Sequence, residues 1–437
     1  MSVKRQRATG RTAGGRAAAV LAAVVCGTAL LPGAAWAAGD GTGYVFADGA
    51  RQVKGAVSNL DAEQLEAGRT YRDTIKKDGK LYYRVDLDAQ QNAYVSVVAV
   101  PKAGGKAAYG DGIKVSLQDG SSTQCGYQDT NFGPSEFPRP ITAYAHRTLA
   151  PESTSCRQAG AYYVLVERDS QAESDPADWQ LEIRFLTEPG VTKTGPTALP
   201  ENWASGTPQP PAGGPQRRTG GAGLTDATSL RQGEWRTDIR PGQTLFYRVP
   251  VDWGQQLFTS AELGSSPAAD TYVPHALVLS LANPAGGHVE QDSLTYDGDQ
   301  VTMALDPQRP VAYENRFSSD EGTSGLRFAG WYYLSATLSP EIAKTYGDKP
   351  LPLTLRVNLT GRPTSGPAYD GAAGPFTVTD EDRDAAASGQ SGPQAAESGT
   401  LRVVGVAGIG VGTVLVLGLG AWWLLARRAA GAGPMPG

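Results

Sequence analysis

The stretch LYYRVDLD, residues 81–88, is repeated later in the chain as LFYRVPVD, residues 245–252. In both copies apolar residues occupy every second position: Leu81, Tyr83, Val85 and Leu87 in the first, and Leu245, Tyr247, Val249 and Val251 in the second. A period of two places one face of a strand on a core and the other toward water, as in antiparallel sheets. The two stretches therefore predict the same half-buried strand in two places.

Further matches follow in the same order in both halves of the chain. IKVSL (113–117) matches LVLSL (277–281), AGAYYVLV (159–166) matches AGWYYLSA (329–336), and LEIRF (181–185) matches LTLRV (353–357). A conserved order of several matches is the signature of a duplicated structural unit. We therefore expect two copies of one domain.

The fold class follows from the strands and the turns between them. Turn clusters such as KKDGK, RPGQ and NPAGG separate the alternating runs, and the region between the termini has no convincing helical period. We expect an all-β protein with two tandem jelly-roll-like antiparallel β-sandwiches, at residues 43–188 and 224–361. The Pro/Gly-rich residues 189–223 predict an extended linker, and residues 362–401 predict a disordered stalk.

Two segments carry a resemblance to a known module. GEWRTDIRPGQTLFYRVPVDWGQQL, from Gly233, resembles the bacterial pre-peptidase C-terminal (PPC) domain, and GRTYRDTIKKDGKLYYRVDLDAQQN, from Gly68, is the more divergent copy because it lacks the Pro-Gly pair. The resemblance implies a small β-sandwich that usually accompanies exported enzymes and is sometimes linked with calcium or glycan binding. No catalytic domain stands beside the two modules in this sequence.

The two ends of the chain indicate export and anchoring. Basic residues followed by an apolar run and the motif Ala35-Trp36-Ala37 predict a signal peptide at residues 1–37. Residues 402–426 contain a long uncharged run, which predicts a transmembrane helix. The Trp pair and Arg427 after it predict a cytoplasmic tail at 427–437. We expect a single-pass cell-membrane protein with an extracellular N-terminal ectodomain, and the Ala/Gly-rich composition favours an actinobacterial type of cell envelope.

Charge and cysteine content narrow the partners. The chain has 39 basic and 44 acidic residues, and several of the basic ones lie in the signal peptide and beside the membrane segment. An acidic ectodomain argues against nucleic acid and anionic lipid as partners. Outside the signal peptide only Cys125 and Cys156 remain, and an isolated pair in an exported domain predicts a disulfide. A metal-binding pair is the alternative, although no His/Cys cluster accompanies it.

Catalytic and cofactor motifs are absent from the sequence. The three histidines, His146, His275 and His288, lie far apart, and neither a nucleophile elbow nor a phosphate-binding loop is present outside the membrane segment. We therefore expect no enzyme activity and no bound cofactor.

Calcium is the one ion that the acidic loops suggest. The hypothesis rests mainly on Asp297 and Asp299 in the loop YDGDQ, with Asp86, Asp88 and Asp252 near strand ends, because hard oxygens suit Ca²⁺. Ordinary turn chemistry explains Asp-Gly equally well.

The alternating ladder offers one candidate recognition surface. Tyr82 and Arg84, like Phe246 and Arg248, face away from the predicted core. There they either form a glycan platform or a partner patch, or pack against a second sheet or the sister domain. We favour packing. The leading hypothesis is a non-catalytic cell-envelope protein that displays two modules to a protein or cell-wall glycan. The alternatives are an accessory subunit of a membrane complex and an envelope hydrolase with an unrecognised site.

Overall fold

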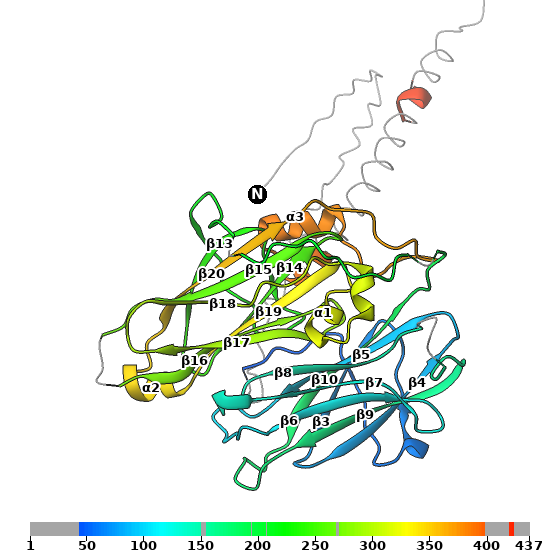
Figure 1. Ribbon diagram of the computed structural model, residues 1–437, viewed down its shortest axis with the longest axis horizontal. Coiled ribbons are helices and arrows are strands. Elements are labelled where there is room, and N and C mark those ends of the chain that lie inside the picture. The colour runs from blue at the N-terminus through cyan, green and yellow to red at the C-terminus, as the bar shows by residue number, and fades with distance from the viewer. Residues whose placement is uncertain are drawn as a thin grey trace, which may run out of the picture. The chain divides into compact units, whose positions relative to one another are not determined.

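A computed structural model describes residues 43–149, 154–193, 195–206, 208–267, 271–397 and 419–423. These residues form four five-stranded sheets, which make two β-sandwiches (Figure 1). Sandwich 1 contains strands β1 to β10 and sandwich 2 contains strands β11 to β20. The expectation of an all-β chain with two tandem sandwiches is confirmed.

Sandwich 1 has one sheet in the order β1-β3-β10-β5-β8 and another in the order β2-β4-β9-β6-β7. Its strands are β1 (Arg51–Gln52), β2 (Glu63–Gln64), β3 (Arg69–Ile75), β4 (Lys80–Leu87), β5 (Asn92–Val100), β6 (Gly112–Gln118), β7 (Gln124–Asn131), β8 (Ile141–Arg147), β9 (Gly160–Asp169) and β10 (Trp179–Glu188). Among its eight long strands the partners are nested, since β3 pairs with β10, β4 with β9, β5 with β8 and β6 with β7.

Sandwich 2 repeats this order as β11-β13-β20-β15-β18 and β12-β14-β19-β16-β17. Its strands are β11 (Pro215–Arg217), β12 (Thr228–Ser229), β13 (Gly233–Ile239), β14 (Thr244–Val251), β15 (Gln256–Leu263), β16 (Val273–Ala282), β17 (His288–Tyr296), β18 (Val301–Ala304), β19 (Gly330–Leu338) and β20 (Leu351–Thr360).

The short helical segments are η1 (Asn59–Asp61), η2 (Gly133–Ser135), η3 (Tyr313–Phe317), α1 (Glu321–Gly325), α2 (Glu341–Tyr346), α3 (Asp380–Ser388) and a turn of helix at 392–397.

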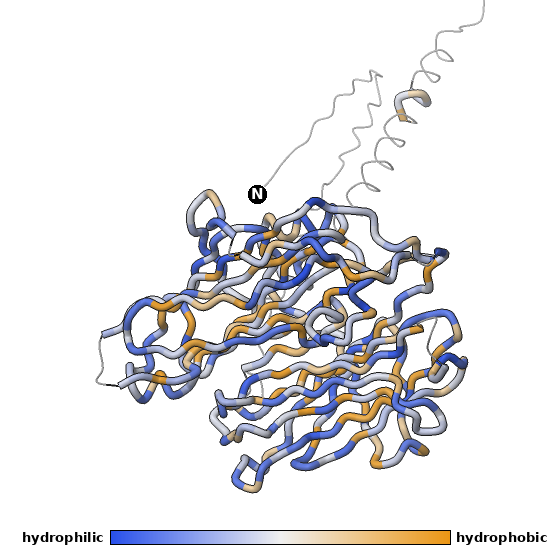
Figure 2. Tube along the Cα trace, viewed as in Figure 1, coloured by the Kyte–Doolittle hydropathy of each residue, from blue (hydrophilic) through white to orange (hydrophobic). Residues whose placement is uncertain are grey.

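The period-two pattern produces the core of each sandwich. In β4 the alternate residues Tyr83, Val85 and Leu87 are buried, and their counterparts in β14 lie in the core of sandwich 2. The same alternation can be followed along the strands in Figure 2. Apolar burial of this kind is the main favourable term in folding, at about 25 cal/mol per Å² of apolar surface.

The short edge strands differ from the expected antiparallel pairing. β1, β2, β11 and β12 each pair in parallel with the first or second long strand of their sandwich. A parallel neighbour requires a crossover connection rather than a hairpin. In sandwich 1 the chain makes this crossover by passing through β2, in the opposite sheet, between β1 and β3.

The two sandwiches contact each other through the outer faces of two sheets. All nine residues of β5 are buried, because its inward side chains lie in the core of sandwich 1 and its outward ones contact sandwich 2. Val98 and Val100 pack with Phe246, while Tyr94 packs with Phe328. A strand buried on both faces reads as a continuous apolar run rather than an alternating one.

The linker at 189–223 is packed rather than extended into solvent. The Gln256 side chain both donates to the Ala204 carbonyl oxygen at 2.6 Å and accepts from the Ala204 amide at 3.1 Å. Arg309 donates to the carbonyl oxygen of Pro200 at 2.8 Å, and β11 joins a sheet of sandwich 2. Specific side-chain clamps therefore hold a segment whose composition alone suggests a free coil.

Residues 362–397 differ most from expectation. This segment, the C-terminal strap, packs on both sandwiches, whereas its Gly/Ala/Ser-rich sequence predicts a disordered stalk. The Asp370 amide donates to the Gly190 carbonyl oxygen at 2.7 Å, and the Tyr369 hydroxyl donates to Glu188 at 2.7 Å. Phe376 is fully buried between the sandwiches. One buried aromatic ring and a few directed hydrogen bonds are enough to hold a chain whose average composition is polar.

The membrane and export predictions lie outside the described part of the chain. The predicted signal peptide is outside it entirely, and so is the predicted transmembrane helix apart from residues 419–423. Among the residues that the structure describes, none of the helices has both the length and the apolar character needed to cross a bilayer.

Candidate functional site

The outward-facing residues of β4, Tyr82 and Arg84, and those of β14, Phe246 and Arg248, have different surroundings. Phe246 of β14 is 3% exposed and meets the ring of Tyr44 edge to face at a centroid distance of 5.6 Å. Tyr82, its equivalent in β4, is partly exposed. Packing, the preferred interpretation of these outward-facing residues, is therefore correct for Phe246, whereas Tyr82 keeps part of its surface in solvent.

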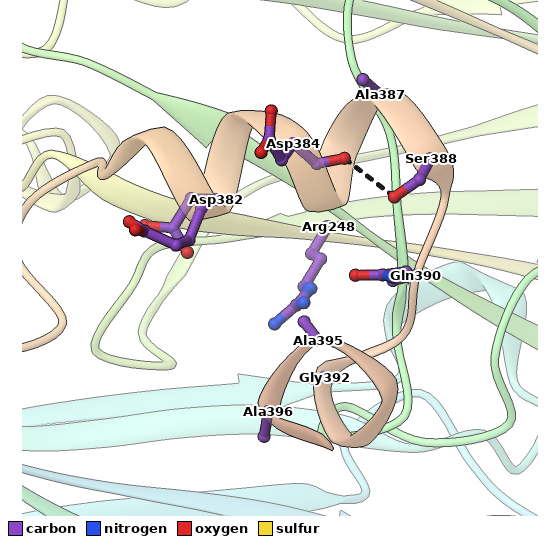
Figure 3. Close-up of a pocket in the computed structure, with 10 residues that line it drawn as sticks. Arg248, Asp382, Asp384, Ala387, Ser388, Gln390, Gly392, Ala395 and Ala396 are labelled. Atoms are coloured by element: carbon purple, nitrogen blue, oxygen red, sulfur yellow. Dashed lines mark hydrogen bonds between the residues drawn. The ribbon is translucent and has the colours of Figure 1, made fainter. Parts of the chain in front are cut away.

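Arg248 is covered by the C-terminal strap (Figure 3). Its guanidinium lies 4.0 Å from the ring centroid of Trp331, and its Nε donates to Ser229 Oγ at 2.8 Å. Burial lowers the pKa of Arg248. Helix α3 and the helical turn at 392–397 line an open pocket of about 770 Å³ beside it.

Helix α3 is attached to this face by directed contacts. Trp331 Nε1 donates to Asp382 at 2.8 Å, and Arg383 forms an ion pair with Asp252 at 2.5 Å. A capping box at Thr379 satisfies the first amides of the helix. The outer face of β14 and β19 is thus occupied by polypeptide on two sides, by sandwich 1 and by the strap.

The equivalent face of sandwich 1 carries a cluster of tyrosines, here called the tyrosine face: Tyr82, Tyr127 and Tyr163. The register of the sheet puts Tyr82 of β4 opposite Leu165 of β9, Leu165 opposite Ser116 of β6, and Ser116 opposite Tyr127 of β7. Tyr163 is opposite Arg84 in the next outward row. Directly opposed residues have Cβ atoms only about 5 Å apart. Leu165 and Ser116 are buried at 6% and 1% exposure, so the row meets solvent through Tyr82 on one side of them and Tyr127 on the other.

The tyrosine face is open and its charges are paired. Tyr127 is 48% exposed, with the Lys114 ammonium 4.9 Å from its ring centroid. Arg84 pairs with Asp86 at 2.8 Å, and Lys80 pairs with Glu167 at 2.6 Å. The hydrogen bond to Glu167 raises the pKa of Lys80. Aromatic rings among balanced charges offer both apolar contact and hydrogen bonds to a partner.

The predicted disulfide is confirmed beside this face. Cys125 in β7 is bonded to Cys156, which closes 31 residues of sequence separation. The bond ties the loop before β9 to an edge strand of the tyrosine-bearing sheet. The alternative of a metal-binding pair is excluded, since both sulfurs are in the disulfide.

The carboxylates of the calcium hypothesis are used for turns and ion pairs. Asp297 and Asp299 are exposed, and Asp297 accepts the Asp299 amide at 3.1 Å within the turn. Asp88 accepts the amides of Gln90 and Gln91 at 2.8 Å. Within the described ranges no group of three or more His, Cys, Asp or Glu side chains is placed to hold a metal ion. The aspartates named in the calcium hypothesis therefore do not come together as one metal site in the described residues.

The three histidines come from three different strands, β8, β16 and β17. Burial lowers the pKa of His146 to about 3 and that of His288 to about 4, so both are neutral at physiological pH. His146 is stacked on Tyr144 with a centroid distance of 5.2 Å. His275 Nδ1 lies 2.7 Å from Ser293 Oγ on a half-exposed strand surface.

A buried polar network, which no sequence motif marks, joins sandwich 1 to the C-terminal strap. Glu188 at the end of β10 accepts hydrogen bonds at 2.7 Å from Asn92, Tyr94 and Tyr369. Burial raises the pKa of Tyr94. The one signal for this network is the apolar run AYVSVVAV at 93–100, which is too continuous for a strand with a wet face.

Comparisons with known proteins give no family for this chain. No family model matches, and no curated protein matches. Among solved structures, the tandem CBM51 modules of a family 98 glycoside hydrolase from Streptococcus pneumoniae are similar at 9% identity, covering 67% of this chain and 83% of that one, with a TM-score of 0.18. The ANX1 ectodomain from Arabidopsis thaliana is similar at 9% identity, covering 69% and 86%, also with a TM-score of 0.18. Likenesses this distant carry no conclusion about function.

Proposed function

We propose that this chain is a non-catalytic cell-envelope protein that displays two PPC-like jelly-roll modules and recruits a protein partner through its tyrosine face. The nested strand pairing in both sandwiches supports the jelly-roll assignment. The signal peptide at 1–37 and the membrane helix at 402–426 belong to the same proposal. They would export the modules and hold them at the outer surface of the cell membrane.

The comparison of the two copies carries the proposal. In sandwich 2 this outer face is covered by polypeptide, through Phe246 on one side and Arg248 on the other. In sandwich 1 the equivalent residues, Tyr82 and Arg84, stay in contact with solvent, and Tyr127 on the edge strand β7 of the same sheet is half-exposed. A face that serves as a docking surface in one copy and remains open in the other is a candidate for docking a separate chain.

The composition of the tyrosine face fits such a partner. Non-obligate protein interfaces are enriched in Tyr and Arg and are ringed by polar residues. Arg84 and Lys80 are already held by carboxylates, so they would enter an interface in defined positions. Pre-ordered side chains lower the entropy cost of binding.

Site-specific photocrosslinking in the producing cells tests the proposal. We expect p-benzoylphenylalanine at Tyr127 to capture one protein in good yield, because the probe would sit inside the interface. The matched control is the same probe at Tyr272, which is 64% exposed on sandwich 2. The captured band should weaken about tenfold or more when Tyr163→Ser and Arg84→Asp are added, since hot-spot residues each contribute about 2 kcal/mol or more.

Equal capture at Tyr127 and Tyr272 would contradict the proposal, because it would show no preference for the tyrosine face. The same holds if the band at Tyr127 survives Tyr163→Ser and Arg84→Asp while the thermal stability of the variant is unchanged.

A further inference from the structure

Sandwich 2 has a groove on its other outer face, formed by the sheet β11-β13-β20-β15-β18. The groove has a volume of about 560 Å³, within the range of small-molecule sites. Phe258 and Glu262 of β15 and Arg356 and Asn358 of β20 line it. Pro208 and Pro210 of the linker form part of its wall.

The same face of sandwich 1 has a different role. The sheet registers make Phe258 the equivalent of Tyr94, Glu262 the equivalent of Val98, and Asn358 the equivalent of Leu186. In sandwich 1 these three are buried against sandwich 2 or the strap. Sandwich 2 thus has a carboxylate and an amide at two positions where sandwich 1 has apolar contacts.

The charged groups of the groove hold one another in place. Arg356 Nη2 lies 2.7 Å from Glu262 Oε2 and 3.8 Å from Glu234 Oε1. The Arg356 side chain is 22% exposed and each glutamate side chain is 14% exposed. Thr302 donates to Glu262 at 3.3 Å. A partly buried ion pair often gives little net stability, because desolvation offsets the attraction. Folding alone therefore does not account for this cluster.

We propose that this groove binds a neutral saccharide. A sugar ring presents hydroxyls that both donate and accept hydrogen bonds, which matches a rigid array of carboxylate, guanidinium and amide groups. Its C–H faces match the two prolines and the small part of Phe258 that remains accessible, 7%, since apolar walls with a few placed polar groups are typical of ligand sites. Glu234, Glu262 and Asp306 of the lining outnumber Arg356 and the nearby Arg236, which lies 3.6 Å from Glu234, so an anionic ligand would be repelled.

This site is separate from the proposed function, because it lies on the other sandwich and takes a different class of ligand. Either proposal can fail while the other stands. The tyrosine-face variants Tyr163→Ser and Arg84→Asp should leave saccharide binding unchanged.

The test uses the purified full-length chain in detergent micelles on an array of several hundred bacterial, plant and animal oligosaccharides. We expect wild type to retain a set of neutral glycans, with affinities then measured by calorimetry on the best free oligosaccharide. Ser260→Trp places a large ring in the groove without removing an ion pair and should abolish measurable binding. Glu262→Gln should weaken it about tenfold or more, because a hydrogen bond to a charged group is lost.

Asp238→Asn is the matched control. Asp238 lies on the outer face of the same sheet and pairs with Arg217 at 2.7 Å, but it does not line the groove. Binding by this variant should equal that of wild type. Three results would overturn the proposal: no glycan retained by wild type, retention of only charged glycans, or full binding by a Ser260→Trp variant whose melting temperature matches that of wild type.

Discussion

Phe376 is the residue on which the C-terminal strap most depends. Its ring is fully buried, stacks on Phe328 with a centroid distance of 4.7 Å, and meets Tyr94 edge to face at 5.6 Å. Replacing a buried Phe with Ala costs about 3–5 kcal/mol when the surroundings cannot collapse. We expect Phe376→Ala to lower the stability of the docked strap by about 3 kcal/mol, the low end of that range, because the strap can detach instead of leaving an empty cavity.

Native-state hydrogen exchange measures this loss locally. The Thr364 amide donates to the Trp253 carbonyl oxygen at 2.9 Å, and the Asp370 amide donates to that of Gly190 at 2.7 Å. Both amides should exchange about 100-fold faster or more in the variant, since each 1.4 kcal/mol is tenfold. Amides of the β14–β19 ladder should change far less, because they belong to the core of sandwich 2.

The neighbouring substitution Thr377→Ala is the control. Thr377 is exposed, so its loss should change the same exchange rates by less than about threefold. Unprotected Thr364 and Asp370 amides in wild type, or equal rates in wild type and Phe376→Ala, would refute the conclusion that the strap is docked.

Two further predictions concern sandwich 1. Cys156→Ser removes a bond that closes 31 residues of sequence separation and should lower the free energy of unfolding by about 3–4 kcal/mol, as measured by urea denaturation; an unchanged midpoint would contradict it. Burial holds the pKa of His146 at about 3, whereas an unfolded His titrates near ~6.5, so the unfolded state binds the extra proton as the pH falls from ~6.5 toward 4. The contribution of His146 to stability should therefore fall by about 1.4 kcal/mol per pH unit in that window, and His146→Phe, whose ring replaces an imidazole with an unpartnered Nδ1, should remove this slope. Parallel pH profiles for the two proteins would show that the ring is not buried neutral.

The local sequence was sufficient for the strands and the duplication. Side chains on a strand point to alternate faces, so Tyr83, Val85 and Leu87 could be assigned to a core without knowledge of the partner strands. The disulfide was also predictable, because only Cys125 and Cys156 remain outside the signal peptide. These features depend on the period of apolar residues and on the number of cysteines, and both can be read from the sequence alone.

The candidate recognition surfaces were only partly predictable. The alternation showed that Tyr82 and Arg84 face outward, but Tyr127 and Tyr163 join them only through the register of β6, β7 and β9. The saccharide groove had no sequence signal at all. Glu262 and Arg356 are far apart in sequence and meet because β15 and β20 are neighbours in one sheet.

The predictions made from amino-acid composition differ most from the structure in the linker and the strap. A Gly/Ala/Pro-rich segment has few side chains that can bury apolar surface, so its average composition predicts disorder. Docking is decided instead by single contacts with distant residues, such as Phe376 against Phe328 and Gln256 against Ala204.

The sequence by itself determined the class of each strand, the two-copy plan and the disulfide, because these follow from local periodicity and residue identity. Only the tertiary structure decided which copy of a face is covered and which is open. The equivalent residues Tyr82 and Phe246 have nearly the same local sequence, and one is partly exposed while the other is buried. That difference arises from the surface that each strand meets, which lies far away in the chain.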